Sequence, residues 1–186
     1  CAESSIKIEK ARKGFLNEDE QDSIYGAAKE FYDYPFFVDD TPSLNIMEMR
    51  SRARKMVKKH GIKVIFVDHM QLVDAPKEET RSLQLGYISK QLKAMAKELQ
   101  VPVVSLAQLN RKVEERENKR PMLSDLRESG NIEQDADVVM FLYRDEYYNP
   151  DTNNPKKNLA EVIIGKQRNG PTGVFELRFD PTCGRF

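Results

Sequence analysis

Long hydrophobic runs are missing from the sequence, and so is any excess of charge of one sign. No apolar stretch approaches the ~20 residues that a membrane-spanning helix needs, and no signal-peptide pattern opens the chain. The 186 residues include 30 Lys and Arg and 30 Asp and Glu, which gives a net charge of zero. Overall charge therefore neither favours nor opposes a nucleic-acid partner, because any basic surface must be local. We expect a cytoplasmic chain without membrane contact.

Cysteine and histidine are also scarce. The two cysteines, Cys1 and Cys183, lie far apart and lack the spacing of metal ligands. A disulfide framework is therefore not indicated. The two histidines, His60 and His69, have no metal partner at ligand spacing, so we assign neither a metal-binding role.

What the sequence does contain is an alternation of apolar strands and amphipathic helices. Residues 1–34 are polar and helical in pattern. Clear helices are predicted over 39–61, capped by Thr41 or Ser43 and ended by Gly61, and over 79–100. The apolar side of the first helix holds Leu44, Met47, Met49, Ala53 and Val57, and that of the second holds Leu85, Ile88, Leu92, Met95 and Leu99.

Strands fill the intervals between these helices. They are predicted over 36–40, 62–68, 101–108 and 138–144, and as a hairpin within 160–180 that turns around 169–173. The alternation implies an α/β fold with a mostly parallel sheet, covered by helices on both faces, and an antiparallel hairpin at its C-terminal edge. Segments 110–121 and 145–157 are predicted loops.

Polar residues follow three of the predicted strands. Asp68 ends the first, Ser105 and Gln108 end the second, and Arg144 and Asp145 end the third. Ligands of open parallel sheets bind beyond the carboxyl ends of the strands, so this lining is typical of a nucleotide site.

Two of these residues suit a phosphate chain with magnesium. An aspartate after an apolar strand can hold hydrated Mg²⁺, the Walker B role, and Asp68 is also compatible with an ordinary cap or turn. Gln108 can hydrogen-bond a terminal phosphate or a water, and it can equally begin the next loop.

Two further segments suggest anion binding. Lys166 and Arg168 are two residues apart on a strand and share a side, which favours an anion between them, such as a phosphate group of a neighbouring subunit. A solvated edge strand guarded by charge is the alternative. The stretch "DLRESG", 125–130, offers an arginine, backbone N–H groups and a glycine for gripping a phosphodiester backbone, or else a capped surface turn.

Taken in order, these stretches resemble the motor domain of the bacterial replicative hexameric DNA helicases, the DnaB family. The resemblance lies in "VIFVDHMQLV", "ISKQLKAMAKELQVPVVSLAQLNRKVE", "KRPMLSDLRESGNIEQDADVVMFLYRDEYY" and "EVIIGKQRNGPTGVFELRF", and it covers almost the whole chain. His69 and Met70 depart from it, since the family usually has Tyr and Leu there.

The resemblance implies a RecA-like ATPase core with ATP and Mg²⁺ between subunits of a homohexamer, and single-stranded DNA in the central channel. Asp68 would hold Mg²⁺ through water, and Gln108 would sense the γ-phosphate. Lys166 and Arg168 would reach the neighbouring subunit's ATP, with Arg168 as the arginine finger. The DNA-backbone loop would contain Arg127, Glu128 and Gly130, and 110–121 resembles the other channel loop. Primase and a helicase loader are further implied partners.

One element of the family is absent: no G-x-x-x-x-G-K-[ST] phosphate loop occurs in the sequence. In the family this loop lies upstream, with the first strand and the general-base glutamate. We therefore expect residues 1–186 to be a single partial RecA-like domain that begins after the Walker A segment, supplies half of an ATP site and is inactive alone. Cys1 also fits a processed lipoprotein terminus or unrecorded residues, but the missing motif favours a truncation point.

Three functions remain open from the sequence. The first is an ATP-dependent replicative helicase that unwinds duplex DNA by translocating along a single strand. The second is a non-catalytic RecA-like module for helicase assembly or loading. The third is a DNA-repair or clock-type RecA relative, against which "DLRESGNIEQDAD" and "KQRNGPTG" argue.

Overall fold

The computed structural model describes residues 1–129 and 131–186, which form two compact units. Unit 1 comprises Cys1–Asp39, Leu142–Ile163 and Val174–Phe186. Unit 2 comprises Asp40–Phe141 and Ile164–Gly173. We describe each unit by itself.

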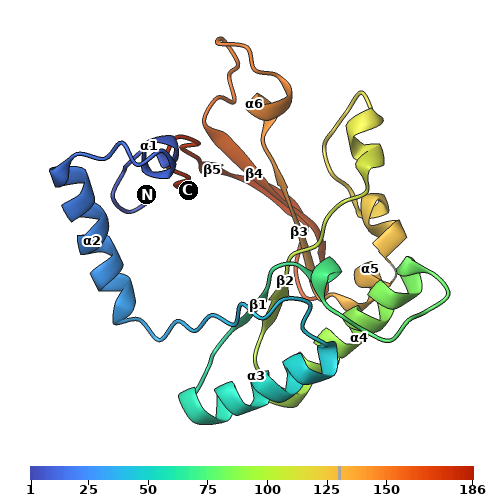
Figure 1. The fold of residues 1–186 in the computed structure, drawn as a ribbon. Helices are drawn as coiled ribbons and strands as arrows, with labels where there is room; N and C mark the ends of the chain where they lie inside the picture. Colours follow the sequence, from blue (N-terminus) through green and yellow to red (C-terminus); the bar gives the residue numbers. More distant parts are fainter. Residues whose placement is uncertain (130) are drawn as a thin grey trace. The chain divides into compact units, whose positions relative to one another are not determined.

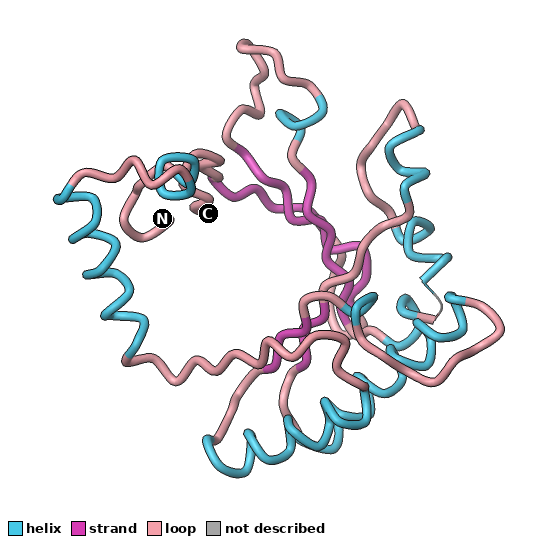
Figure 2. The backbone as a smooth tube through the Cα atoms, viewed as in Figure 1, coloured by secondary structure: helices cyan, strands magenta, loops and turns pink. Residues whose placement is uncertain are grey.

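Two long helices dominate unit 2. Helix α3 (Ile46–His60) starts at Asn45, whose side chain accepts from the Met47 amide, and ends at Gly61 in the left-handed conformation. Helix α4 (Arg81–Leu99) starts at Thr80, whose hydroxyl accepts from the Leu83 amide. The two helices lie alongside each other beside the first strands (Figures 1 and 2).

A pair of short parallel strands forms the centre of unit 2. Strand β1 (Ile65–Val67) pairs with β2 (Val103–Ser105), with Ile65 opposite Val103 and Val67 opposite Ser105. The helical turn η1 (Met70–Leu72) follows β1, and η2 (Arg111–Glu115), η3 (Leu123–Ser129) and α5 (Ile132–Asp135) follow β2. The strands lie inside the predicted ranges 62–68 and 101–108 but are shorter.

The core of unit 2 lies between the helices and one face of this strand pair. The buried apolar residues that form it are Ile46, Val67, Met70, Val73, Ala75, Leu85, Ile88, Leu92, Met95 and Ile132. Four of the five residues predicted for the apolar face of α4 are among them, and Leu99 packs against them, so that prediction is confirmed. On α3, by contrast, Met47 is exposed.

The other face of the strand pair is open in unit 2. Phe66 on β1 is 62% exposed, and Val64, Val104 and Leu106 are exposed as well. The expectation of helices on both faces is therefore wrong for the part of unit 2 that the structure describes, because α3 and α4 pack on the same side.

A second sheet contains β3 (Val138–Tyr143), β4 (Leu159–Gln167) and β5 (Gly173–Arg178) in that order. It is antiparallel and includes the hairpin predicted at the C-terminal end. The α/β class is confirmed. The strand predicted over 138–144 was expected to join the parallel sheet, but it lies next to β4 in the second sheet.

Unit 1 brings the two ends of the described chain together. Helices α1 (Ile8–Arg12) and α2 (Glu18–Tyr32) open it, and the Ile8 amide donates to the Thr182 carbonyl at 2.9 Å. Figure 1 shows the two termini side by side. A capping box between Asn17 and Glu20 starts α2, which buries none of its own residues.

Two local predictions are wrong. Residues 36–40 form no strand, because the segment pairs with no neighbouring strand and leaves Phe36 and Val38 exposed. The predicted loop 145–157 contains a short helix, α6 (Asp145–Tyr148). No helix among the described residues has the length and apolar character needed to cross a membrane.

Candidate functional site

Asp68 lies where the strand-end argument expects it, directly after β1. The preceding residue, Val67, pairs with Ser105, the last residue of β2. The Asp68 side chain is 77% exposed, and its Oδ1 lies 3.7 Å from Nδ1 of His69. The carboxylate therefore faces solvent at the carboxyl end of the parallel pair.

Gln108 lies at the same edge, three residues beyond β2, and is exposed. Three hydrogen bonds hold the two strand ends against each other. The Leu106 amide donates to the Val67 carbonyl at 3.0 Å, and the Met70 amide donates to the Leu106 carbonyl at 3.0 Å. The side-chain amide of Gln71 donates to the Gln108 carbonyl at 3.3 Å. These bonds fix the backbone beneath both side chains.

The side chains at this edge fit a magnesium ion better than a metal ion whose ligands are all protein side chains. Among the described residues no group of three His, Cys, Asp or Glu side chains could hold a metal ion. A single exposed carboxylate is what Mg²⁺ uses when waters and substrate phosphates complete its shell. Asp68 fits that role.

Arg144 and Asp145 were expected at the same edge, but their contacts lie within unit 1. Arg144 stacks over the Phe179 ring at 4.4 Å from its centroid. Asp145 begins α6 and accepts hydrogen bonds from Asn154 (2.7 Å), Asn149 (3.1 Å) and Tyr143 (3.1 Å). The third strand end therefore organises its own loop.

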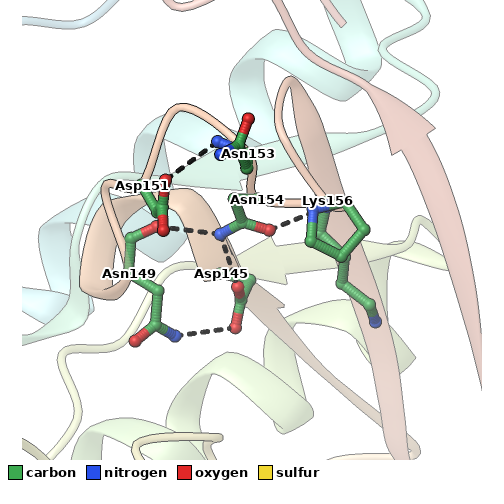
Figure 3. Close-up of a pocket in the computed structure, with 7 residues that line it drawn as sticks. Asp145, Asn149, Asp151, Asn153, Asn154 and Lys156 are labelled. Carbon is green, nitrogen blue, oxygen red and sulfur yellow. Dashed lines mark hydrogen bonds between the residues drawn. The ribbon is translucent and has the colours of Figure 1, made fainter.

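That loop forms a small polar pocket, shown in Figure 3. The Asn154 side chain bridges it, since Nδ2 donates to both Asp145 and the Asn149 carbonyl while Oδ1 accepts from the Lys156 amide. The hydrogen bond from Asn154, followed by those from Asn149 and Tyr143, holds the pKa of Asp145 below its usual range. The carboxylate is thus part of the loop's scaffold.

Lys166 and Arg168 do share a side, as the spacing predicts, and both bind the end of α5. Lys166 Nζ donates to the carbonyls of Glu133 (2.5 Å) and Ala136 (2.8 Å). Arg168 Nη2 donates to the Gln134 carbonyl at 2.7 Å, and Nη1 lies 3.3 Å from Oδ1 of Asp137. The negative groups between the two cations are backbone carbonyls and one carboxylate.

The predicted DNA-contacting residues fall on and after η3. Arg127 and Glu128 belong to this helical turn by their backbone, while their side chains and the whole of Gly130 lie outside the described residues. The neighbouring charged segment, 110–121, was predicted to be a loop and contains η2.

A buried aspartate ties these two segments together. Oδ2 of Asp125 accepts from Arg116 Nη2 at 2.9 Å and from the Met122 amide at 2.8 Å. The Asp125 carbonyl also accepts from the Asn110 amide at 3.2 Å. The two segments that resemble channel loops are therefore one hydrogen-bonded substructure.

Sequence reasoning gave no role of their own to two residues of this neighbourhood, Asp125 and Asp137. Asp125 has a local signal, because an acid at the third position of a helical turn commonly accepts from the amide that precedes the turn. Asp137 has none, because its partners Lys93 and Arg168 are distant in sequence.

Comparisons with known proteins show the family of the chain. Residues 1–186 match the family of the DnaB-like helicase C terminal domain. The chain is 44% identical to the replicative DNA helicase DnaB of Geobacillus stearothermophilus over 188 residues, and 47% identical to that of Buchnera aphidicola over 186 residues. The chain belongs to the DnaB helicase C-terminal domain family.

A solved structure confirms the fold of this chain. A DnaB-like replicative helicase, described with its interactions with primase, matches with a TM-score of 0.90 and 40% identity. The match covers 100% of this chain and 46% of that one. The chain spans 41% of the Geobacillus DnaB and 40% of the Buchnera DnaB, with 100% and 98% of its own length matched.

Proposed function

We propose that the protein carrying this chain is an ATP-dependent replicative DNA helicase, and that residues 1–186 form part of its RecA-like motor. The observation that carries the proposal is the edge where β1 and β2 end, with Asp68 and Gln108 exposed over a hydrogen-bonded backbone. Relatives over the full chain are replicative DNA helicases, which supports the same assignment.

Asp68 and Gln108 would act on the phosphates of ATP. Asp68 would hold a hydrated Mg²⁺, which neutralises charge on the β- and γ-phosphates when bound. The Gln108 amide can both donate and accept, so it suits a γ-phosphate or its attacking water. Phosphoryl transfer depends mainly on positioning and charge, which these two residues supply from one edge.

The remaining site residues would act on a neighbour and on DNA. Lys166 and Arg168 would reach the ATP of the adjacent subunit in a homohexamer, with Arg168 as the arginine finger. Arg127, Glu128 and Gly130 would hold the backbone of single-stranded DNA. Primase and a helicase loader are the proposed protein partners, and the primase contact reported for the DnaB-like neighbour supports the first.

The test compares ATP hydrolysis and forked-duplex unwinding by the complete protein with those of its Asp68→Asn variant. The change keeps the shape of the side chain and removes its charge. We expect hydrolysis to fall on the order of 10²-fold, the usual effect of losing one electrostatic stabiliser. Asp74→Asn is the matched control, since Asp74 is another exposed carboxylate of unit 2.

Two outcomes would contradict the proposal. Equal hydrolysis by the Asp68→Asn and Asp74→Asn variants would leave Asp68 as an ordinary strand-end residue. A complete wild-type protein that binds helicase partners yet hydrolyses no ATP would instead support the non-catalytic assembly module.

A further inference from the structure

Helix α5 ends in a cradle that holds Lys166 of β4 and Arg168, the residue that follows β4. Four hydrogen bonds reach α5 and the two residues after it, Ala136 and Asp137, and their donors are Lys166 of β4 and Arg168, which follows β4. Besides the three side-chain bonds already described, the Arg168 amide donates to the Asp137 carbonyl at 2.9 Å. The direction of the Arg168 side chain is therefore set by α5 and by the residue two positions after it.

Asp137 is the charged member of this cradle. Its Oδ1 faces Arg168, and its Oδ2 accepts a hydrogen bond from Lys93 on α4. The hydrogen bond from Lys93, with the positive charges of Lys93, Arg168 and Lys166, keeps the pKa of Asp137 below its usual range. The carboxylate is ionised at neutral pH and faces Arg168 as an anion.

The cradle orients Arg168 without locking it. The side chains of Asp137 and Arg168 are 57% and 48% exposed, and ion pairs this exposed contribute little to stability. A phosphate carries more charge than one carboxylate and can accept bidentate hydrogen bonds from a guanidinium. Arg168 can therefore exchange Asp137 for a phosphate at small cost while starting from a defined direction.

We propose that Asp137 is a positioning residue for Arg168, holding the guanidinium toward the incoming phosphate of a neighbouring subunit's nucleotide. This inference rests on the proposed function, because it needs Arg168 to act on ATP. Asp137 acts through Arg168 and touches no substrate itself. Lys93 would fix the other oxygen of the carboxylate, so that Oδ1 stays aimed at Arg168.

The test measures single-turnover ATP hydrolysis by assembled complete protein carrying Asp137→Asn, with Asp137→Glu as the rescue variant. We expect the Asp137→Asn rate to fall roughly 10- to 100-fold, because a misplacement of about 1 Å can cost ~10²-fold. The dissociation constant for a non-hydrolysable ATP analogue and the melting temperature should stay close to wild type. Asp137→Glu should recover most of the rate, since it restores the charge.

Glu98→Gln is the matched control. Glu98, on α4, is also a carboxylate paired with two cations, Arg50 and Arg54, and its hydrogen bonds from Arg50 and then Arg54 lower its pKa. It has no contact with the cradle among those that the structure describes. Its loss should leave the hydrolysis rate unchanged.

A double variant separates the possible failures. In an Arg168→Ala background, Asp137→Asn should cause no further loss. Three outcomes would each overturn the positioning role. The first is a full additional loss of rate from Asp137→Asn in the Arg168→Ala background. The others are an Asp137→Asn rate equal to that of Glu98→Gln, and a rate loss that merely follows a lowered melting temperature. If Arg168→Ala alone hydrolyses ATP normally, the trans role in the proposed function fails, and the positioning role fails with it.

Discussion

Replacing Gly165 by alanine tests the close packing beneath the cationic end of β4. A Cβ atom built on Gly165 would lie 2.6 Å from Cε2 and 3.2 Å from Cδ2 of Phe141, and 3.5 Å from Cδ2 of Leu123. Normal contacts between carbon atoms are about 3.5–4.0 Å, so the ring or the strand must move by about 1 Å. Phe141 is 4% exposed, and a buried ring has little space to move into.

The size of the effect follows from this overlap. Adding a methyl group to a packed core usually costs about 1–3 kcal/mol. Alanine also restricts the unfolded chain, which returns about 0.4–1 kcal/mol. We expect Gly165→Ala to lower the free energy of unfolding by about 1–2 kcal/mol, which corresponds to a fall in melting temperature of about 2–8 °C for a chain of this size.

Urea denaturation and thermal melting measure this change. Gly173→Ala is the matched control, because Gly173 starts β5 and a Cβ there meets nothing within 4 Å. Gly173→Ala should leave stability unchanged or slightly raised. If Gly165→Ala is as stable as Gly173→Ala, the packing of Phe141 against β4 is looser than described, and the placement of Lys166 one residue later loses its support.

Two further predictions concern DNA and pH. Arg127→Ala should weaken single-stranded DNA binding equally for all sequences, because a phosphate contact reads no base, and it should reduce the dependence of the logarithm of the binding constant on the logarithm of salt concentration by about one unit. Fluorescence anisotropy at several salt concentrations measures both effects. A sequence-dependent loss would contradict the assignment. Asp145→Asn should lower the melting temperature at neutral pH, because the folded state holds the pKa of Asp145 below its ordinary value of ~4. That contribution is present above the ordinary pKa and is lost as pH falls through the folded one. The wild-type advantage should therefore shrink in acid, and a constant difference down to low pH would show that charge is not its source.

Much of the fold of unit 2 could be predicted because its signals are local. The apolar face of α4 and the left-handed Gly61 at the end of α3 both depend on neighbours within a few residues. The start of α3 could not be predicted so well. Asn45 forms a bridge with Asp74, and the Ile46 amide donates to the Asp74 carbonyl at 2.9 Å. This tertiary pairing fixes the start of α3 at Asn45, and the residues before it form a turn, so neither Thr41 nor Ser43 begins the helix.

The candidate site likewise has a part that could be predicted from the sequence and a part that could not. The position of Asp68 follows from where an apolar strand ends, and the shared side of Lys166 and Arg168 follows from their spacing. The groups that bind these cations could not be predicted, since the α5 carbonyls and Asp137 precede them by about thirty residues. The roles of all these residues in ATP hydrolysis rest on the family resemblance and stay predictions.

The central claim is that Asp68 and Arg168 serve one ATP from two different subunits. A mixing experiment tests this claim with complete protein that carries either Asp68→Asn or Arg168→Ala. Each variant alone should hydrolyse little ATP. In mixed rings, some interfaces pair an intact Asp68 with an intact Arg168 from the neighbour.

Single-turnover hydrolysis by the mixed rings is the measurement, because one intact interface is enough for one turnover. The account predicts partial recovery that rises toward an equal mixture of the two variants. Rings made with the double variant Asp68→Asn/Arg168→Ala in place of Asp68→Asn should show no recovery. If mixed rings of the two single variants assemble and bind ATP yet hydrolyse no more than either variant alone, Asp68 and Arg168 do not form one site across a subunit boundary.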